Sequence, residues 1–178
     1  MGNLVMLVVV LAGCSNKRML DGERVEVLAL PTCTIAVPAG WNVTTEAGPV
    51  PPGAKVLVLD HAVEGFLPSI VVQELAMGAP DHEAIVTATD KFCHDSILIP
   101  ISTQQDTNPG RARAVTIGTF RGCDVEMRDK KTAQAGRQIA LSNGKGAVSF
   151  VCNRDQNPPA GVDVDGACDA LARAITPK

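Results

Sequence analysis

The sequence predicts a single α+β domain, with a mostly antiparallel sheet of about seven strands and two helices packed on it. Three observations predict this class. Short runs rich in Val, Ile and Leu recur along the chain, separated by turns that contain Pro, Gly or Asn. Two stretches instead repeat their apolar residues at helical spacing, with several strands before and between them. The 178 residues are 46% hydrophobic but only 3% aromatic, so the core is expected to consist mainly of Val, Ile, Leu and Ala.

Ahead of this domain the chain begins with an apolar leader. Residues 4–12 are all apolar, but a membrane-spanning helix needs about 20 such residues. Their length and position suit the apolar core of a secretory signal. Leu11-Ala12-Gly13-Cys14 resembles the bacterial lipobox, which implies cleavage before Cys14 and a lipid on its thiol. No Lys or Arg precedes the apolar core, and the alternative is an unprocessed hydrophobic terminus with a chance cysteine.

The lipobox resemblance predicts how the chain is organised and where it resides. Residues 1–13 are expected to be a signal peptide, residues 14–30 the lipidated Cys14 with a short tether, and residues 31–178 the domain. The lipid would hold the domain to a membrane of the bacterial cell envelope, because each buried CH₂ contributes ~0.8 kcal/mol and several acyl chains act together. Ser15 after the lipidated residue resembles sorting to the outer membrane, facing the periplasm or the cell surface.

The net charge argues against one class of partner. The formal net charge is −3, and residues 1–13 carry no charged side chain, so the mature chain keeps this value. Binding to nucleic acid requires a stripe of basic side chains that displaces counterions from the phosphates. We therefore expect no nucleic-acid partner.

The first part of the domain is expected to contain three strands. Cys33–Val37, Lys55–Leu59 and Ser69–Leu75 are rich in Val, Ile and Leu over strand length. Residues 46–53 are expected to form a loop, because three prolines and two glycines remove ladder hydrogen bonds and favour turns.

A helix is expected next. Asp81 follows Pro80 and can cap the N-terminus of a helix with its carboxylate. Ile85, Ala88 and Phe92 then recur at helical spacing. The sequence thus predicts one continuous helix through this segment.

Four further strands are expected after this helix. Ile97–Ile101 and Ala112–Phe120 are predicted to be strands on either side of a polar turn over 106–111. Gln138–Ser142 and Gly146–Cys152 flank Asn-Gly-Lys, which is a strong hairpin signal because Asn-Gly tolerates the positive φ of a type I′ turn. A second helix is expected over about 165–175.

The order of these elements and several short signatures resemble a known family. The chain is similar to the PsbP-like lipoproteins, among them the DcrB and LpqN-type proteins, in TIAVPAGW, SIVVQEL, DHEAI, GRARAVTIG and RQIALSNGKGAVSFVC and in its closing helix. The resemblance covers roughly residues 32–176. It implies a seven-stranded antiparallel sheet with helices packed on it. It implies no common catalytic set, because fold resemblance suggests architecture and a bias toward binding rather than a reaction.

One disulfide can be predicted from the expected elements. With Cys14 lipidated, five cysteines remain, and export favours disulfides among them. Cys152 lies on one face of its strand, and Cys168 lies on the apolar stripe of the closing helix with Leu171, so both sulfurs can point into the gap between sheet and helix. The sequence therefore predicts a Cys152–Cys168 disulfide, which contributes ~3 kcal/mol in the chain-entropy model. Cys33, Cys93 and Cys123 allow three pairings with one thiol left over, and the sequence does not choose.

The three histidines are the candidates for metal binding. His61, His82 and His94 each adjoin an aspartate, and an imidazole oriented by a carboxylate suits a metal ligand or a general base. His82 and His94 are twelve residues apart, about 120° around a helix, so they are not expected to converge. No cofactor is expected, and a metal-binding protein or metal-dependent hydrolase that uses the three histidines is the alternative.

The remaining motifs indicate no enzyme. Gly144-Lys145-Gly146 lacks the spacing of a P-loop, and no G-x-S-x-G nucleophile elbow is present. The basic run Arg128, Lys130 and Lys131 is expected to be a solvated turn, or else a contact for anionic lipid headgroups. We expect a non-enzymatic, lipid-anchored domain that binds an envelope protein or another envelope component. A carrier of a small ligand, held in a cleft between sheet and helix, is a further alternative.

Overall fold

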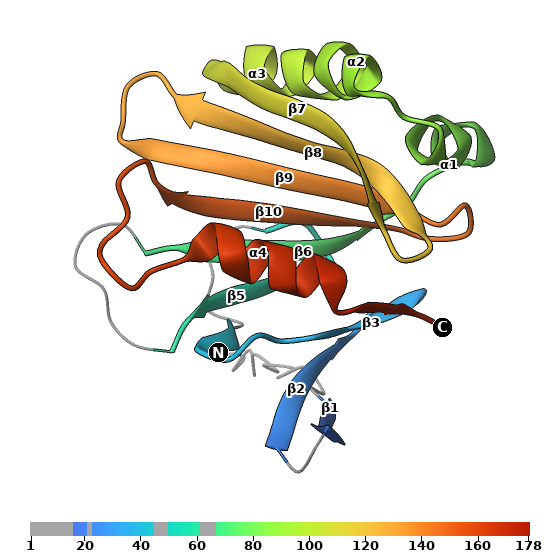
Figure 1. The fold of residues 1–178 in the computed structure, drawn as a ribbon, viewed down its shortest axis with the longest axis vertical. Helices are drawn as coiled ribbons and strands as arrows, with labels where there is room; N and C mark the ends of the chain where they lie inside the picture. The colour runs from blue at the N-terminus through green and yellow to red at the C-terminus, as the bar shows by residue number, and fades with distance from the viewer. Residues whose placement is uncertain (1–15, 21–22, 45–49, 61–66) are drawn as a thin grey trace, which may run out of the picture.

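A seven-stranded sheet forms the centre of the molecule in the computed structural model. The structure describes residues 16–20, 23–44, 50–60 and 67–178. Every neighbouring pair of its strands is antiparallel (Figure 1). From edge to edge the order is β4 (Trp41–Thr44), β5 (Lys55–Leu59), β6 (Ser69–Leu75), β10 (Ala147–Asp155), β9 (Gln134–Ser142), β8 (Phe120–Asp129) and β7 (Thr107–Ile117). The predicted α+β class with a seven-stranded antiparallel sheet is confirmed.

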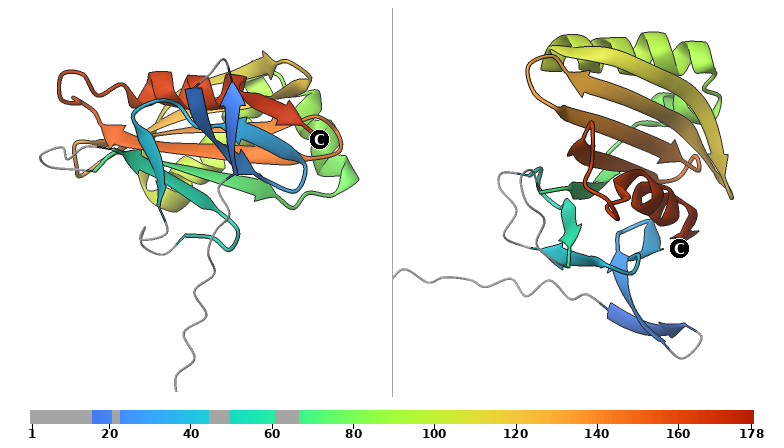
Figure 2. Two further views of the ribbon diagram at one scale, coloured as in Figure 1. Left: turned by 90° about the horizontal axis from the view of Figure 1, so that it is seen from below. Right: turned by 60° about the vertical axis from the view of Figure 1, so that its left-hand side comes forward.

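The two ends of the described chain form a second sheet, which the sequence did not indicate. Its four strands lie in the order β1 (Asn16–Leu20), β2 (Glu23–Ala29), β3 (Cys33–Ala36) and β11 (Ile175–Pro177). The segment 14–30, predicted as a tether, therefore contains two strands, and Leu28 of β2 is buried in the core. The right-hand view of Figure 2 shows this small sheet on the same side of the main sheet as α4.

The opposite face of the main sheet is covered by a run of short helices. These are α1 (Ala79–Val86), α2 (Asp90–Phe92), the π-helix η1 (Cys93–Leu98) and α3 (Ile99–Gln105). The strand predicted over Ile97–Ile101 is wrong, because Leu98 is buried and Ile97 and Ile101 pack as parts of a helix on β8. A short apolar run does not distinguish a strand from a buried helix by its period.

The first predicted helix is also divided in two. α1 begins at Ala79 after the N-cap Gly78, so Asp81 lies in the first turn and not at the cap. The helix ends at Val86, and the side chain of Thr89 accepts a hydrogen bond from Phe92 N to start α2. An N-cap residue competes with a continuing helix, which explains the interruption at this Thr.

The turn predicted over 106–111 is mostly strand. The chain reverses at Asp106, which has a φ of 53°, and β7 starts at Thr107. Pro109 is tolerated because β7 is an edge strand, and the register shifts between Pro109 and Ala112. The next reversal is at Gly118, where φ is 58°, and β8 follows it as a strand that the sequence did not predict.

The hairpin between β9 and β10 is confirmed, with a different turn. Ser142 pairs with Ala147, and the Asn143 side-chain oxygen accepts hydrogen bonds from the backbone N of Lys145 and Gly146 at 2.9 and 2.8 Å. Only Gly144 in this loop has a positive φ, whereas a type I′ turn requires two such residues.

The remaining helix, α4 (Val164–Arg173), packs on β10 over the main core. Asp163 caps it by accepting a hydrogen bond from Gly166 N. Two disulfides cross-link the fold: Cys152–Cys168 joins β10 to α4, and Cys93–Cys123 joins η1 to β8. The first is the predicted pair, and the second leaves Cys33 as a free, buried thiol. The closing segment is shorter than predicted, because residues 175–177 form β11 and not the end of the helix.

Candidate functional site

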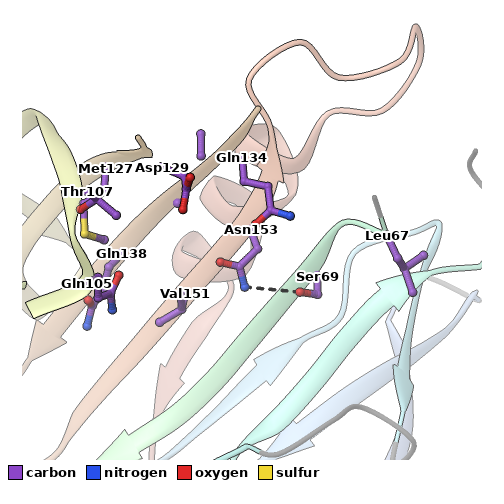
Figure 3. Close-up of a pocket in the computed structure, with 12 residues that line it drawn as sticks. Leu67, Ser69, Gln105, Thr107, Met127, Asp129, Gln134, Gln138, Val151 and Asn153 are labelled. Atoms are coloured by element: carbon purple, nitrogen blue, oxygen red, sulfur yellow. Dashed lines mark hydrogen bonds between the residues drawn. The ribbon is translucent and has the colours of Figure 1, made fainter. Parts of the chain in front are cut away.

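A cavity of about 420 Å³ opens on the helix-bearing face of the main sheet, at the end where α3 leads into β7. Six of its lining side chains are neutral amides or hydroxyls: Ser69, Gln105, Thr107, Gln134, Gln138 and Asn153. Apolar groups complete the wall, among them Leu67, Met127 and Val151 (Figure 3). We call this cavity the amide cleft. Its volume lies within the range of about 300–1,000 Å³ that is usual for ligand sites.

The register of the sheet places the polar groups of the cleft together. Asn153 of β10 lies opposite Gly136 of β9 and Ser69 of β6. Gln138 lies two residues beyond Gly136 and so projects from the same face. Because Gly136 has no side chain, it forms the floor: a Cβ there would lie 3.9 Å from Met127 Cε and 4.0 Å from Asn153 Oδ1.

Several polar atoms in the amide cleft are available to a ligand. Gln138 Nε2 donates to Ser149 Oγ at 3.1 Å, and Asn153 Nδ2 donates to Ser69 Oγ at 3.4 Å. Within the described residues, the side-chain carbonyl oxygens of these two amides accept no hydrogen bond, and the buried Thr107 Oγ1 has no partner. Buried polar groups usually have partners, so these atoms are suited to bind polar groups of a ligand.

One charged side chain lines the cleft. Asp129 accepts hydrogen bonds from the backbone N of Lys131 and Thr132, both at 2.7 Å. These backbone hydrogen bonds hold the pKa of Asp129 below its usual value, so it is ionised at neutral pH. Its lone pairs stabilise a turn, and the other residues that line the cleft do not titrate. The cleft is therefore suited to hydrogen bonding with a neutral polar ligand rather than to proton transfer.

Of the three predicted histidines, the structure describes His82 and His94, and their side chains have different partners. His82 Nδ1 lies 2.7 Å from Ser142 Oγ, while His94 Nδ1 lies 2.7 Å from Asp95 Oδ1 on the exposed side of η1. His61 lies outside the described residues, as does Cys14. In the described part of the chain, no group of three or more His, Cys, Asp or Glu side chains could hold a metal ion.

The His82–Ser142 contact has the spacing of a base and a nucleophile but a different role. Ser142 is fully buried, and its Oγ also accepts a hydrogen bond from Gly144 N at 3.0 Å. A nucleophile has to reach substrate, and a hydroxyl enclosed in this way does not. The pair instead attaches α1 to the β9–β10 hairpin.

The basic run is partly neutralised. Lys130 Nζ binds Asp106 Oδ1 at 2.7 Å, and Lys131 Nζ lies 3.7 Å from Asp106 Oδ2. Lys130 and Lys131 are exposed, in agreement with the predicted solvated turn, whereas Arg128 is exposed but lies in β8.

Sequence reasoning missed the amide cleft. Its signal is weak: Gln134, Gly136 and Gln138 alternate along one strand face, and Asn153 follows in the next strand. Alternating polar residues on a strand are also the ordinary pattern of a solvated sheet face. The cleft becomes visible only when α3, from another part of the chain, is placed beside that face.

Comparisons with known proteins bear on the fold. No protein-family model and no curated protein matches the sequence. A crystal structure of a Bacteroides thetaiotaomicron protein matches 82% of this chain at 12% identity with a TM-score of 0.43, and this chain spans 45% of that protein. The Ran-binding protein Mog1p of Saccharomyces cerevisiae matches 86% of this chain and 95% of its own, at 14% identity with a TM-score of 0.51.

None of the helices in the described segments is long and apolar enough to cross a membrane. The two disulfides fit an extracytoplasmic location, where such bonds persist. At 14% identity the likeness to Mog1p concerns the fold alone. The chain thus has a Mog1/PsbP-like α+β fold, the architecture that the resemblance to PsbP-like lipoproteins implies.

Proposed function

We propose that this protein is a lipid-anchored lipoprotein of the bacterial cell envelope, and that it acts as a non-enzymatic binding domain through the amide cleft. The observation that carries the proposal is the chemistry of the cleft: neutral amide and hydroxyl groups line a cavity of about 420 Å³. Such groups recognise hydrogen-bonding ligands, for example the backbone of a protein segment. The fold supports a binding role, because Mog1p, of the same architecture, is a Ran-binding protein.

The lipid anchor is supported by the lipobox-like residues before Cys14 and by the two disulfides, which favour an exported chain. Its test is fractionation of cells that produce the full chain. We expect the wild type in the membrane fraction and a Cys14→Ala variant in the soluble fraction. An intact mass of the extracted protein without added acyl groups would rule out the anchor.

The binding role is tested by site-specific photo-crosslinking in the envelope. A photoreactive residue at Gln134, on the rim of the cleft, is expected to give a reproducible crosslinked protein. The same residue at Lys145, exposed at the tip of the β9–β10 hairpin, is the matched control and is expected to give none. A Gly136→Leu change, which fills the floor, should abolish the Gln134 crosslink.

The crosslinking result also distinguishes a protein partner from a small ligand in the cleft. If Gln134 yields no protein adduct, but a small molecule co-purifies with the wild type and is lost from the Gly136→Leu variant, the protein is a ligand carrier instead. If neither occurs, the amide cleft is not a binding site, and the proposal fails.

A further inference from the structure

A second cavity lies on the opposite face of the main sheet, between β7 and the C-terminal end of α4. Its volume is about 240 Å³. Figure 1 shows the β7–β8 turn curling toward this end of α4, which packs on β10. We call this cavity the arginine groove, because Arg113, Arg137 and Arg173 line it. By strand alternation Arg137 projects from the face of β9 opposite to Gly136 and Gln138, so the groove is separate from the amide cleft.

The floor of the arginine groove is a buried ion-pair network. Arg137 is only 4% exposed, and its Nε and Nη2 donate to the two oxygens of Asp124 at 2.8 and 3.0 Å. Arg137 Nη2 also donates to Asp169 Oδ1 of α4 at 2.6 Å, and Nη1 donates to the carbonyl oxygen of Asp165 at 3.3 Å. The network therefore attaches α4 to the sheet and holds Arg137 in one position.

Asp124 connects this floor to the rim of the groove. Arg113 of β7 lies directly opposite Asp124 in the strand pairing, and its Nε and Nη2 donate to Asp124 Oδ2 at 2.9 and 2.6 Å. Burial alone would raise the pKa of Asp124, but hydrogen bonds from Arg137 and Arg113 outweigh it and lower the pKa below its usual value. Asp124 thus stays anionic and orients the Arg113 guanidinium.

Two guanidinium groups in the groove keep donors free. Arg113 is 43% exposed, and its Nη1 makes no hydrogen bond within the described residues. Arg173 is exposed on the last turn of α4, and in the described chain it has no ion pair or hydrogen bond. Arg137 helps to attach α4 to the sheet, whereas Arg173 takes no part in that attachment.

The charges in the groove do not cancel. Three guanidinium groups face two carboxylates, those of Asp124 and Asp169, so one positive charge is in excess. The adjacent pair Arg154–Asp165 is neutral in sum, with Nε and Oδ2 2.9 Å apart. The whole chain carries −3, so this is a local positive site on an acidic protein, where the field favours an anion.

The wall of the groove is apolar next to these charges. Val115 and Ile117 of β7 and Ile139 of β9 line it, and they adjoin the main core. From this juxtaposition we propose that the arginine groove binds a carboxylate that carries a short apolar group, as at the C-terminus of a peptide or in a short-chain fatty acid. Arg113 and Arg173 contact the carboxylate in a fork geometry, and Asp124 and Arg137 are positioning residues.

The test is titration calorimetry on the full chain with three probes: hexanoate, N-acetyl-Ala-Leu as the free acid, and the same peptide as its C-terminal amide. We expect saturable binding of the acids and none of the amide. A lower dissociation constant for hexanoate indicates that the groove binds fatty acids. A lower dissociation constant for the peptide acid indicates that it binds the C-terminus of a peptide. Either result supports the groove, because both ligands present the same group.

Three variants make the test specific to the groove. Arg173→Gln, at an exposed position with no partner to lose, is expected to weaken acid binding about tenfold, the usual effect of losing a charged hydrogen bond. Arg121→Gln removes a comparable exposed arginine that does not line the groove, and should change nothing. Gly136→Leu, which blocks the amide cleft, should also leave acid binding unchanged, so this proposal and the proposed function can fail separately.

The inference is overturned if neither acid binds, if the amide binds as tightly as the acids, or if Arg173→Gln binds like the wild type. Thermal melting of each variant identifies any loss of fold. Chemical-shift changes on hexanoate addition should fall on Val115 and Ile139, and changes confined to the amide cleft would also overturn it.

Discussion

At the scale of single residues, two glycines in adjacent strands differ in how much space a side chain would have. A Cβ on Gly122 of β8 would lie 1.8 Å from the backbone oxygen of Ala140 in β9. A Cβ on Gly136 would meet only side-chain atoms, at ordinary contact distances of 3.9 and 4.0 Å. Gly122 is therefore required by the close approach of two backbones, whereas Gly136 leaves space that forms the amide cleft.

This difference predicts opposite responses to the same substitution. Gly122→Ala should lower the free energy of unfolding by about 3 kcal/mol, because the strands must separate to admit a methyl group. Gly136→Ala should change it by less than about 1 kcal/mol, since the site has room and an ordinary φ. Denaturant unfolding of both variants measures the two values, and equal losses would contradict the structural assignment.

The free thiol of Cys33 makes stability depend on pH. Burial is the main cause that raises the pKa of Cys33, and the charge of Glu74 adds to it, so that the value moves from 9.0 to about 11. The unfolded chain therefore releases this proton first, and stability is expected to fall as the pH rises from about 9 toward about 11. When the free energy of unfolding is measured against pH, a Cys33→Ala variant should not show this fall. Parallel curves for the two proteins would show that the thiol is not shielded.

At the scale of secondary-structure elements, α4 is the helix most firmly attached to the sheet. A disulfide, the Arg137 network and the Arg154–Asp165 ion pair each connect it to β9 or β10. The helix face that meets the sheet is apolar, with Leu171 and Cys168 fully buried. Because α4 forms one side of the arginine groove, its attachment sets the width of that groove.

Removing the α4 disulfide should lower stability without changing the fold. The double variant Cys152→Ala/Cys168→Ala is expected to lose about 3 kcal/mol of unfolding free energy, as the chain-entropy model gives for a loop of this length. The matched double variant Cys93→Ala/Cys123→Ala, which opens a longer loop, should lose slightly more. Urea unfolding under non-reducing conditions gives both values. A negligible loss for the first variant would indicate that the ion pairs alone hold α4.

At the scale of the whole molecule, the two sheets share one core. Leu28 and Ile35 of the second sheet, with Leu30 between their strands, belong to the same buried cluster as Phe150 and Leu171. If the second sheet separated from the larger unit, the apolar side chains that it buries there would be exposed to water, which is unfavourable. The molecule is therefore expected to unfold as one unit.

Trp41 provides the test of this cooperativity. It is the single tryptophan of the chain, and it is 7% exposed in β4 of the main sheet. Its fluorescence and the far-ultraviolet circular dichroism of all strands should give the same urea midpoint, as two-state unfolding requires. An earlier dichroism transition would mean that the second sheet unfolds separately.

The sequence predicted those parts of the fold that depend on local pattern. The strands over 55–59 and 69–75 have the bounds that alternation and Val, Ile content indicate, and Asn143 with Gly144 marks the hairpin. The segment 97–101 has the composition of a strand but forms part of a helix, since its burial depends on β8, which comes later in the chain. The sequence also did not predict the arginine groove, because Arg113, Arg137 and Arg173 are far apart in the chain.

By itself, the sequence determined the α+β class, the strands over 55–59 and 69–75, the β9–β10 hairpin and the Cys152–Cys168 disulfide, because alternation and helical spacing are properties of neighbouring residues. Only the tertiary structure decided the second sheet, the Cys93–Cys123 pair and the two cavities. Each of these requires segments from different parts of the chain to meet, and no local periodicity records which segments do so.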